Sequence, residues 1–264
     1  MPLRRAPNST QTLFSKMTSK LFLNITQGRG DVLTFPHTVM PQYGSHVSVD
    51  EVGTYGCRTC VCVYFPLSEG RCFVAHVDAH MEMSLGSPSG SGAFLCNGVA
   101  AGDALKDEVK EKLAAALHGH HESLQNPENK AKAIVICPYQ KIEGQPSTGS
   151  YMVDAVCDFF SLDKATMKTQ DAHGFIVKPV SGDVQLLRWG GDGKARASDG
   201  DFDSKDLSGN FPEEVPGKYG WAGLDHTNER EWSALWSRGR WVRVDPAKAI
   251  GPGPGPGPGP GPGC

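Results

Sequence analysis

The sequence lacks several features that would point to particular protein classes. It has no apolar run approaching the roughly 20 residues needed to cross a bilayer, so we expect no membrane association. It also lacks an excess of charge of one sign: the formal net charge is −3 over 264 residues. Because nothing here compensates phosphate charge, we expect no nucleic-acid partner.

Acidic residues are missing from the start of the chain, where none precedes Asp31. This predicts a flexible basic leader over residues 1–30, weakly similar to a mitochondrial transit peptide. The sequence shows no secretory signal, that is, no apolar core followed by a cleavage site. We therefore expect a cytoplasmic protein, with nuclear and mitochondrial locations as lesser alternatives. At the other end an alternating Gly-Pro run starts at Gly251 and has nothing to bury. The pattern therefore predicts one domain over residues 31–245, a tail over 246–264, and a monomer.

Hydrophobic periodicity predicts the fold class. Residues 60–65 form an apolar, β-branched and aromatic run, and a turn then separates them from a second strand at 71–77. Helical spacing of apolar residues indicates helices at 103–117 and 151–162, with a strand at 131–137 between them and a second hairpin at 174–189. This order predicts an α/β fold of mixed α+β layers, in which strand hairpins pack with helices in a sandwich.

Cysteine and histidine are the residues that carry candidate chemistry. Cys60 begins the first strand of the predicted hairpin and His76 lies near the end of the second, so the two can face each other. A thiol attacks as its thiolate, which a neighbouring imidazole stabilises, and the same imidazole can pass the proton to a leaving group. Asp78 would share a strand face with His76 and can orient it or bind a substrate amine. A structural role for each residue is the competing interpretation.

The segment resembles the eukaryotic protein N-terminal asparagine amidohydrolases. The similarity is carried by Thr59-Cys60 before the first strand, by the run from Cys72 through His76 to Asp78, and by the hairpin containing residues 173–177 and 182–186. Thr54, six residues before Cys60, is similar to a threonine of the bacterial chemoreceptor glutamine deamidases. The resemblance spans roughly residues 54–189.

This resemblance implies a thiol amidohydrolase with a deamidase-like sandwich fold. Cys60, His76 and Asp78 would be catalytic, and Thr54 and Thr59 would contact substrate. The implied substrates are proteins or peptides bearing Asn, with N-terminal Asn converted to Asp in a degradation signal and Gln as the alternative. No cofactor is implied.

A metal site is the rival interpretation of the same residues. Cys57-x2-Cys60 followed by His76-x3-His80 has the general spacing of a Cys2His2 zinc site. His76, Asp78 and His80 alternate along a strand and form a second candidate set. The first set would suit a zinc-stabilised protein-binding module, and such a module could also be metal-free and without catalysis. The second set could hold a hydrolytic metal. Eight cysteines in a chain of this length favour reduced, mostly buried thiols over a disulfide scaffold.

Overall fold

The computed structural model describes residues 20–39, 46–81, 99–142, 144–166 and 172–188, with short strands at 201–202, 221–225, 233–237 and 240–243. These residues form a mixed α/β fold, as the sequence predicts. The strands are β1 (Lys20–Asn24), β2 (Gly30–Thr34), β3 (His37–Val39), β4 (Val47–Val49), β5 (Val52–Thr54), β6 (Val61–Ser68), β7 (Arg71–Met81), β8 (Ile134–Ile136), β9 (Lys141–Ile142), β10 (Gln145–Pro146), β11 (Ala172–Lys178), β12 (Asp183–Arg188), β13 (Asp201–Phe202), β14 (Trp221–Asp225), β15 (Ser233–Ser237) and β16 (Arg240–Arg243). The helices are α1 (Val99–Ala116), α2 (His121–Gln125), α3 (Pro127–Ala131), α4 (Thr148–Phe160) and the 3-10 turn η2 (Lys164–Thr166).

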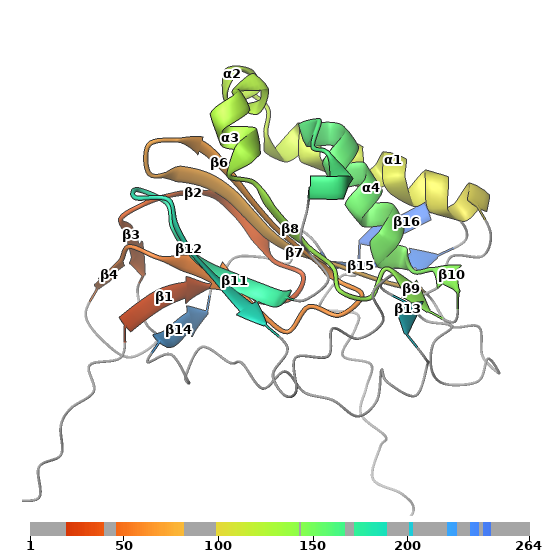
Figure 1. Ribbon diagram of the computed structural model, residues 1–264, viewed down its shortest axis with the longest axis horizontal. Helices are drawn as coiled ribbons and strands as arrows, with labels where there is room; N and C mark the ends of the chain where they lie inside the picture. The colour runs from red at the N-terminus through yellow and green to blue at the C-terminus, as the bar shows by residue number, and fades with distance from the viewer. Residues whose placement is uncertain are drawn as a thin grey trace, which may run out of the picture.

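The antiparallel hairpin of β6 and β7 is the centre of the molecule (Figure 1). It belongs to a sheet of order β16-β15-β7-β6-β8, and the long strand β7 changes partner along its outer edge. Its first half pairs with β2 and its last residues pair with β15. Between these two pairings, the His76 backbone is bonded to Arg29 O and Gly28 N of the preceding turn. His76 therefore lies where the sheet changes its edge strand.

Three layers result from burying both faces of this hairpin. Alternate residues of β6 and β7 point to opposite sides, because side chains in a strand have a period of two. One side packs against α1 and α4, with Val61, Val63 and Phe65 in that core. The other side, which includes Cys62 and Tyr64, packs against a second sheet of order β12-β11-β5-β1-β14. The hairpin sheet is thus the middle layer between helices and the second sheet.

The helical layer is fixed by apolar stripes. In α4 the buried residues Met152, Val153, Val156 and Phe160 recur at helical spacing, and the Phe160 ring stacks on Phe65 with ring centroids 4.3 Å apart. The helix starts after the N-cap Ser147 and ends at Ser161 in the left-handed region, with φ of 54°.

The amino-terminal boundary expected from composition is wrong. Strand β1 pairs in parallel with both β5 and β14, and Phe22 and Leu23 are fully or almost fully buried. The folded part therefore begins by Lys20, inside the stretch expected to be a basic leader. The absence of acidic residues there misled the prediction, because the buried apolar positions decide whether a segment joins the core. Residues 1–19 and the Gly-Pro tail lie outside the described residues.

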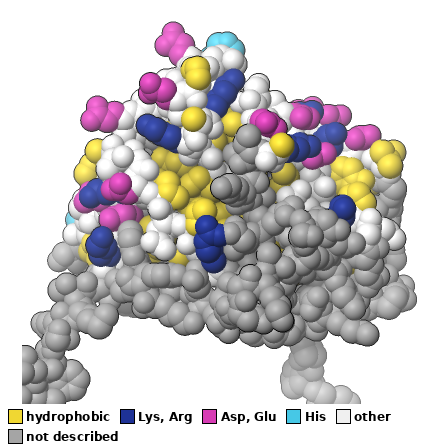
Figure 2. Space-filling view, in the orientation of Figure 1, with side chains coloured by type: hydrophobic (Ala, Val, Ile, Leu, Met, Phe, Trp, Pro, Cys, Tyr) yellow, Lys and Arg dark blue, Asp and Glu magenta, His cyan; other side chains and the backbone are white. Residues whose placement is uncertain are grey.

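None of the described helices is long and apolar enough to cross a membrane. On the exposed side shown in Figure 2, apolar side chains gather in a hollow beneath α2 and α3. A groove there is lined by Tyr64, Leu67, Ile134, Val180 and Val184, beside the hairpin turn. Since Cys60 and His76 lie toward the other end of the hairpin, this groove is separate from the predicted site.

Candidate functional site

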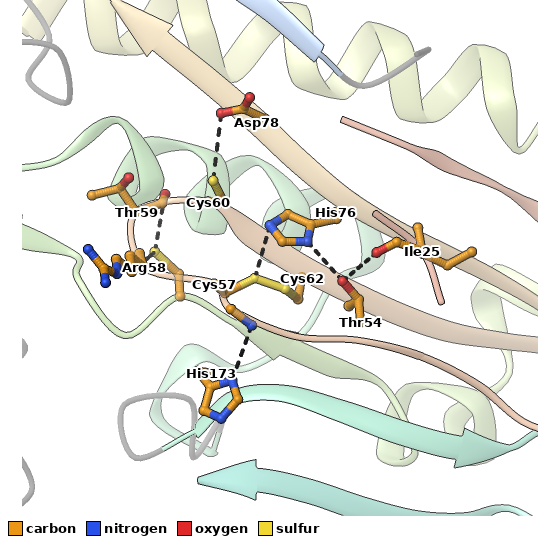
Figure 3. The surroundings of a disulfide bond; sticks show 12 residues. Ile25, Thr54, Cys57, Arg58, Thr59, Cys60, Cys62, His76, Asp78 and His173 are labelled. Atoms are coloured by element: carbon orange, nitrogen blue, oxygen red, sulfur yellow. Dashed lines mark hydrogen bonds between the residues drawn. A yellow bond between two sulfur atoms is a disulfide. The ribbon is translucent and has the colours of Figure 1, made fainter. Parts of the chain in front are cut away.

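The candidate site is built on the loop of residues 55–60, called the site loop below. This loop leaves β5 in the second sheet and enters β6 in the hairpin sheet, so it crosses between the two β layers. It carries Cys57, Thr59 and Cys60. Figure 3 shows these residues next to His76 and Asp78 of β7.

A bulge in β11 holds the first half of the site loop. The pairing of β11 with β12 shifts register between Ala172 and Gly174, which leaves His173 as the extra residue. Its carbonyl accepts a hydrogen bond from Cys57 N at 2.9 Å, and its Nδ1 accepts one from Gly56 N at 3.1 Å. Because His173 is fully buried, these bonds fix the backbone position of Cys57.

The segment that follows β8 and the first turn of α4 hold the second half of the site loop. Tyr139 N donates to Arg58 O at 3.0 Å, and the Cys137 thiol donates to Thr59 O at 3.6 Å. Gly149, in the first turn of α4, lies so close to Thr59 O and Cys137 Sγ that a Cβ atom there would collide with both. Thr59 is buried, and its carbonyl rather than its side chain makes these contacts. A glycine in α4 therefore permits the approach that places Cys60.

Gly149→Ala is expected to destabilise the protein by about 1–3 kcal/mol and to displace Cys60, because the new methyl group meets a backbone oxygen that cannot turn away. Urea unfolding and the rate of Cys60 alkylation would measure the two effects. Gly102→Ala is the matched control, since the three atoms nearest to its Cβ would belong to the ring of Tyr151, a side chain, and not to the backbone. Equal effects of the two variants on alkylation of Cys60 would contradict the proposed role of Gly149.

Cys60 contacts Asp78. The Cys60 thiol donates to Asp78 Oδ1 at 3.6 Å, across the entry to the hairpin. Among the described free cysteines Cys60 is the one that is partly exposed, whereas Cys72, Cys137 and Cys157 are buried. Burial of the sulfur, and next the negative charge of Asp78, raise the pKa of the Cys60 thiol well above its ordinary value. In this arrangement Cys60 is a protonated thiol held by a carboxylate.

His76 contacts Thr54 and Cys57. Its Nδ1 lies 2.8 Å from Thr54 Oγ1, and that hydroxyl donates to Ile25 O at 2.7 Å. Since the hydroxyl proton is used on Ile25, the threonine oxygen accepts from Nδ1–H, and Nε2 is left with its lone pair. This Nε2 lies 3.6 Å from Cys57 Sγ. Burial lowers the pKa of His76 to about 4, against an opposing effect of Asp78, so the ring is neutral at neutral pH.

A disulfide joins Cys57 and Cys62 beside this imidazole (Figure 3). Cys62 is the residue directly opposite His76 in the hairpin. The expectation that all cysteines are reduced is therefore wrong for this pair. It holds for the described cysteines Cys60, Cys72, Cys137 and Cys157, of which the last three are buried.

The structure brings the predicted site residues into one region, with different pairings. The predicted contact between Cys60 and His76 is replaced by two contacts, Cys60 with Asp78 and His76 with Cys57. Thr54 is fully buried and contacts the imidazole, so it positions His76, while its contact with substrate stays a prediction. The sulfurs nearest to His76 are those of Cys57 and Cys62, which differs from the zinc set of Cys57, Cys60, His76 and His80. The side chain of His80 lies outside the described ones.

Comparison with known proteins identifies no relative: no model of a known protein family matches the chain, and no curated protein matches it. The resemblance to asparagine amidohydrolases thus stays a prediction from residues.

Two residues of the site were not assigned a role from sequence. Counting outward from the turn pair Ser68 and Arg71 would place residue 77 opposite Cys62. An irregularity between Pro66 and Ser68 shifts the register by one residue, so that Cys62 faces His76, and the sequence does not show this shift. The role of His173 had no local signal. It depends on a bulge in a strand more than a hundred residues away in sequence, which periodicity does not show.

Proposed function

We propose that this protein is a thiol amidohydrolase that deamidates a protein or peptide carboxamide, with Cys60 as the nucleophile. The observation that carries the proposal is the partly exposed free thiol of Cys60 in contact with Asp78, with a buried neutral imidazole on the same face of the hairpin. Thiol, base and carboxylate are the groups that acyl transfer from an amide requires.

The reaction would proceed in two steps. The Cys60 thiol is bonded to Asp78 and His76 faces Cys57, so the proton would reach His76 only after these side chains rearrange on substrate binding. The sulfur then attacks the carboxamide carbon to form a tetrahedral intermediate. His76 then returns the proton to the departing nitrogen, so that ammonia leaves and a thioester remains. Water, deprotonated by His76, cleaves the thioester and regenerates the thiol. The sum is a carboxamide and water giving a carboxylic acid and ammonia, with no cofactor.

The pairing of His76 with Cys57 makes Cys57 the rival nucleophile. Cys57 is fully buried and bonded to Cys62, however, so a peptide carboxamide cannot reach it in this conformation. Exposure therefore favours Cys60. Its neighbour Asp78 suits a cation on the substrate, and the α-ammonium group of an N-terminal residue is one. Together with the sequence resemblance, this favours N-terminal Asn as substrate, with N-terminal or internal Gln as the alternative. The cytoplasmic location is proposed from the sequence alone, and the Cys57–Cys62 disulfide would be unusual in that compartment.

Mass spectrometry of peptides would test this proposal. Peptides with N-terminal Asn, N-terminal Gln or internal Gln are incubated with wild type, Cys60→Ala, Cys57→Ala and Cys72→Ala. We expect a gain of 1 Da in the Asn peptide with wild type and with Cys72→Ala, a matched control at a buried cysteine of the same hairpin, and none with Cys60→Ala. Retained conversion by Cys60→Ala would refute Cys60 as nucleophile. No conversion of any peptide or folded protein would favour a binding module.

A further inference from the structure

We further propose that the dithiol form of this protein binds one thiophilic divalent cation, of the Zn²⁺ class, through Cys57, Cys62 and His76. The two sulfurs and a ring nitrogen of His76 all lie within 4.8 Å of one another, and all three residues are buried. The existence of this metal site does not depend on the proposed hydrolase activity, although the two share His76. The site also differs from both metal sets expected from sequence spacing.

The imidazole is oriented as a metal ligand. Its Nε2 carries the lone pair and lies 3.6 Å from Cys57 Sγ, a separation close to that of two ligand atoms on one zinc ion. Its Nδ1–H is held by Thr54, whose hydroxyl is held in turn by Ile25 O. Such an outer hydrogen bond fixes the tautomer and the plane of a ligating histidine.

The scaffold around the three residues is rigid. Cys62 and His76 are opposite each other on the two strands of the central hairpin. Cys57 comes from the site loop, where its backbone N–H is bonded to the His173 carbonyl of the neighbouring sheet. The backbones of the three ligands are therefore fixed, and the rearrangement that cation binding needs is a separation of the two sulfurs by rotation of the cysteine side chains.

Charge and ligand softness identify the class of cation. Two thiolates and one neutral imidazole carry a charge of −2, so a divalent cation gives a neutral buried unit, which avoids the cost of an uncompensated buried charge. Thiolate and imidazole select Zn²⁺ over Mg²⁺ or Ca²⁺, which prefer oxygen. Among the described side chains no fourth Cys, His, Asp or Glu joins this group, so water or another small ligand would complete a tetrahedron.

The disulfide and the metal exclude each other. Reduction of the Cys57–Cys62 bond by a small dithiol takes two electrons and two protons from the dithiol, which becomes a disulfide, and yields two thiols. A phosphine supplies the two electrons and becomes a phosphine oxide, while water supplies its oxygen and the two protons. Binding of the cation then releases both thiol protons as the two sulfur–metal bonds form. A metal on Nε2 also occupies the lone pair that the proposed hydrolysis uses, so the loaded protein is expected to be inactive as an amidohydrolase.

Cobalt spectroscopy would test the metal site without reference to catalysis. The full chain is reduced with a phosphine, freed of reductant under anaerobic conditions and titrated with Co²⁺. We expect 1:1 appearance of sulfur-to-cobalt charge transfer and tetrahedral visible bands, which Zn²⁺ abolishes by displacement. The protein left oxidised should give neither signal. Absence of stoichiometric Co²⁺ or Zn²⁺ binding by the reduced wild type would overturn the proposal.

Variants identify the ligands. Cys57→Ser, Cys62→Ser and His76→Ala should each lose the charge-transfer signal, while Cys60→Ser and Cys72→Ser, controls in the same segment, keep it. Thr54→Val should keep the bands but weaken binding by about 10–100-fold, because it removes only the outer hydrogen bond. Circular dichroism would check that each variant is folded. If a ligand variant does not fold, the ligands are identified in wild type instead, by alkylation of the reduced protein with and without Zn²⁺. Bound Zn²⁺ should protect Cys57 and Cys62 from alkylation. Loss of the bands in Cys60→Ser but not in Cys62→Ser would overturn the assignment.

Discussion

Asp78→Asn is expected to make the Cys60 thiol more reactive while lowering the proposed deamidase activity. The carboxylate of Asp78 accepts the Cys60 thiol at 3.6 Å, and its charge is the second cause, after burial, of the raised thiol pKa. Without that charge the pKa falls, and each unit raises the thiolate fraction tenfold. We therefore expect iodoacetamide to alkylate Cys60 faster in the variant than in wild type at pH 8.

Deamidation should respond in the opposite direction. If Asp78 binds the α-ammonium of an N-terminal Asn substrate, losing a charged hydrogen bond lowers kcat/KM by about 10–100-fold. An N-acetylated Asn peptide, which has no ammonium, should not show this loss. The loss of kcat/KM depends on the proposed function, whereas the alkylation rate depends only on the contact between Cys60 and Asp78. The two measurements therefore test the contact and the proposed reaction separately.

Asp103→Asn removes an equal charge from an exposed position of α1 and should change neither rate. If Asp78→Asn left the alkylation rate of Cys60 unchanged, the contact between thiol and carboxylate would have no electrostatic consequence. If it slowed turnover of the acetylated and the free peptide equally, Asp78 would act on the reaction itself and not on the substrate amine.

Acid is expected to destabilise the protein through His76. Burial holds the pKa of His76 at about 4, while in the unfolded chain it is near 6.5. Between these values the unfolded state binds a proton that the folded state does not, so the free energy of unfolding falls as the pH falls from 6.5 to 4. The shift corresponds to a loss of about 3 kcal/mol across that interval, and the stabilisation is complete above pH 6.5.

Urea unfolding under non-reducing conditions at pH 7 and pH 4.5 would measure this loss. His76→Gln is expected to be less stable than wild type at pH 7, because Thr54 loses the imidazole as its hydrogen-bond partner. The glutamine side chain does not titrate, so the stability of this variant lacks the pH dependence that His76 gives to wild type. The difference in the free energy of unfolding between wild type and variant should therefore be smaller at pH 4.5 than at pH 7. A difference that stays constant would mean that His76 takes up its proton equally in both states.

The same neutral imidazole matters for chemistry. A base must be unprotonated to accept the thiol proton, and His76 is unprotonated throughout the physiological range. Its low pKa also means that transfer from Cys60 is uphill in the free protein, since the thiol pKa is raised. A substrate cation at Asp78 would remove part of that barrier by offsetting the carboxylate charge.

The periodicity of apolar residues predicted most of the helices and strands around the site but placed their first residues wrongly. The helix expected at 103–117 is α1 and starts four residues earlier, and the one expected at 151–162 is α4 and starts at Thr148 after the Ser147 cap. The strand expected at 131–137 is shortened to β8 because α3 includes Ala131. Cap and turn chemistry act over three or four residues, which is the size of these errors.

The sequence by itself determined the β6–β7 hairpin, the two amphipathic helices and the presence of a thiol and an imidazole on one strand pair. These follow from alternation, helical spacing and a turn, all of which operate between near neighbours. Only the tertiary structure decided which sulfur meets His76. Cys57 reaches it because the site loop is bonded to the bulge at His173 and packed against Gly149, contacts made by residues that are about 90 to 120 positions away. Such contacts form only when the sheets and the helical layer pack together, so no pattern within the segment could assign the pairing.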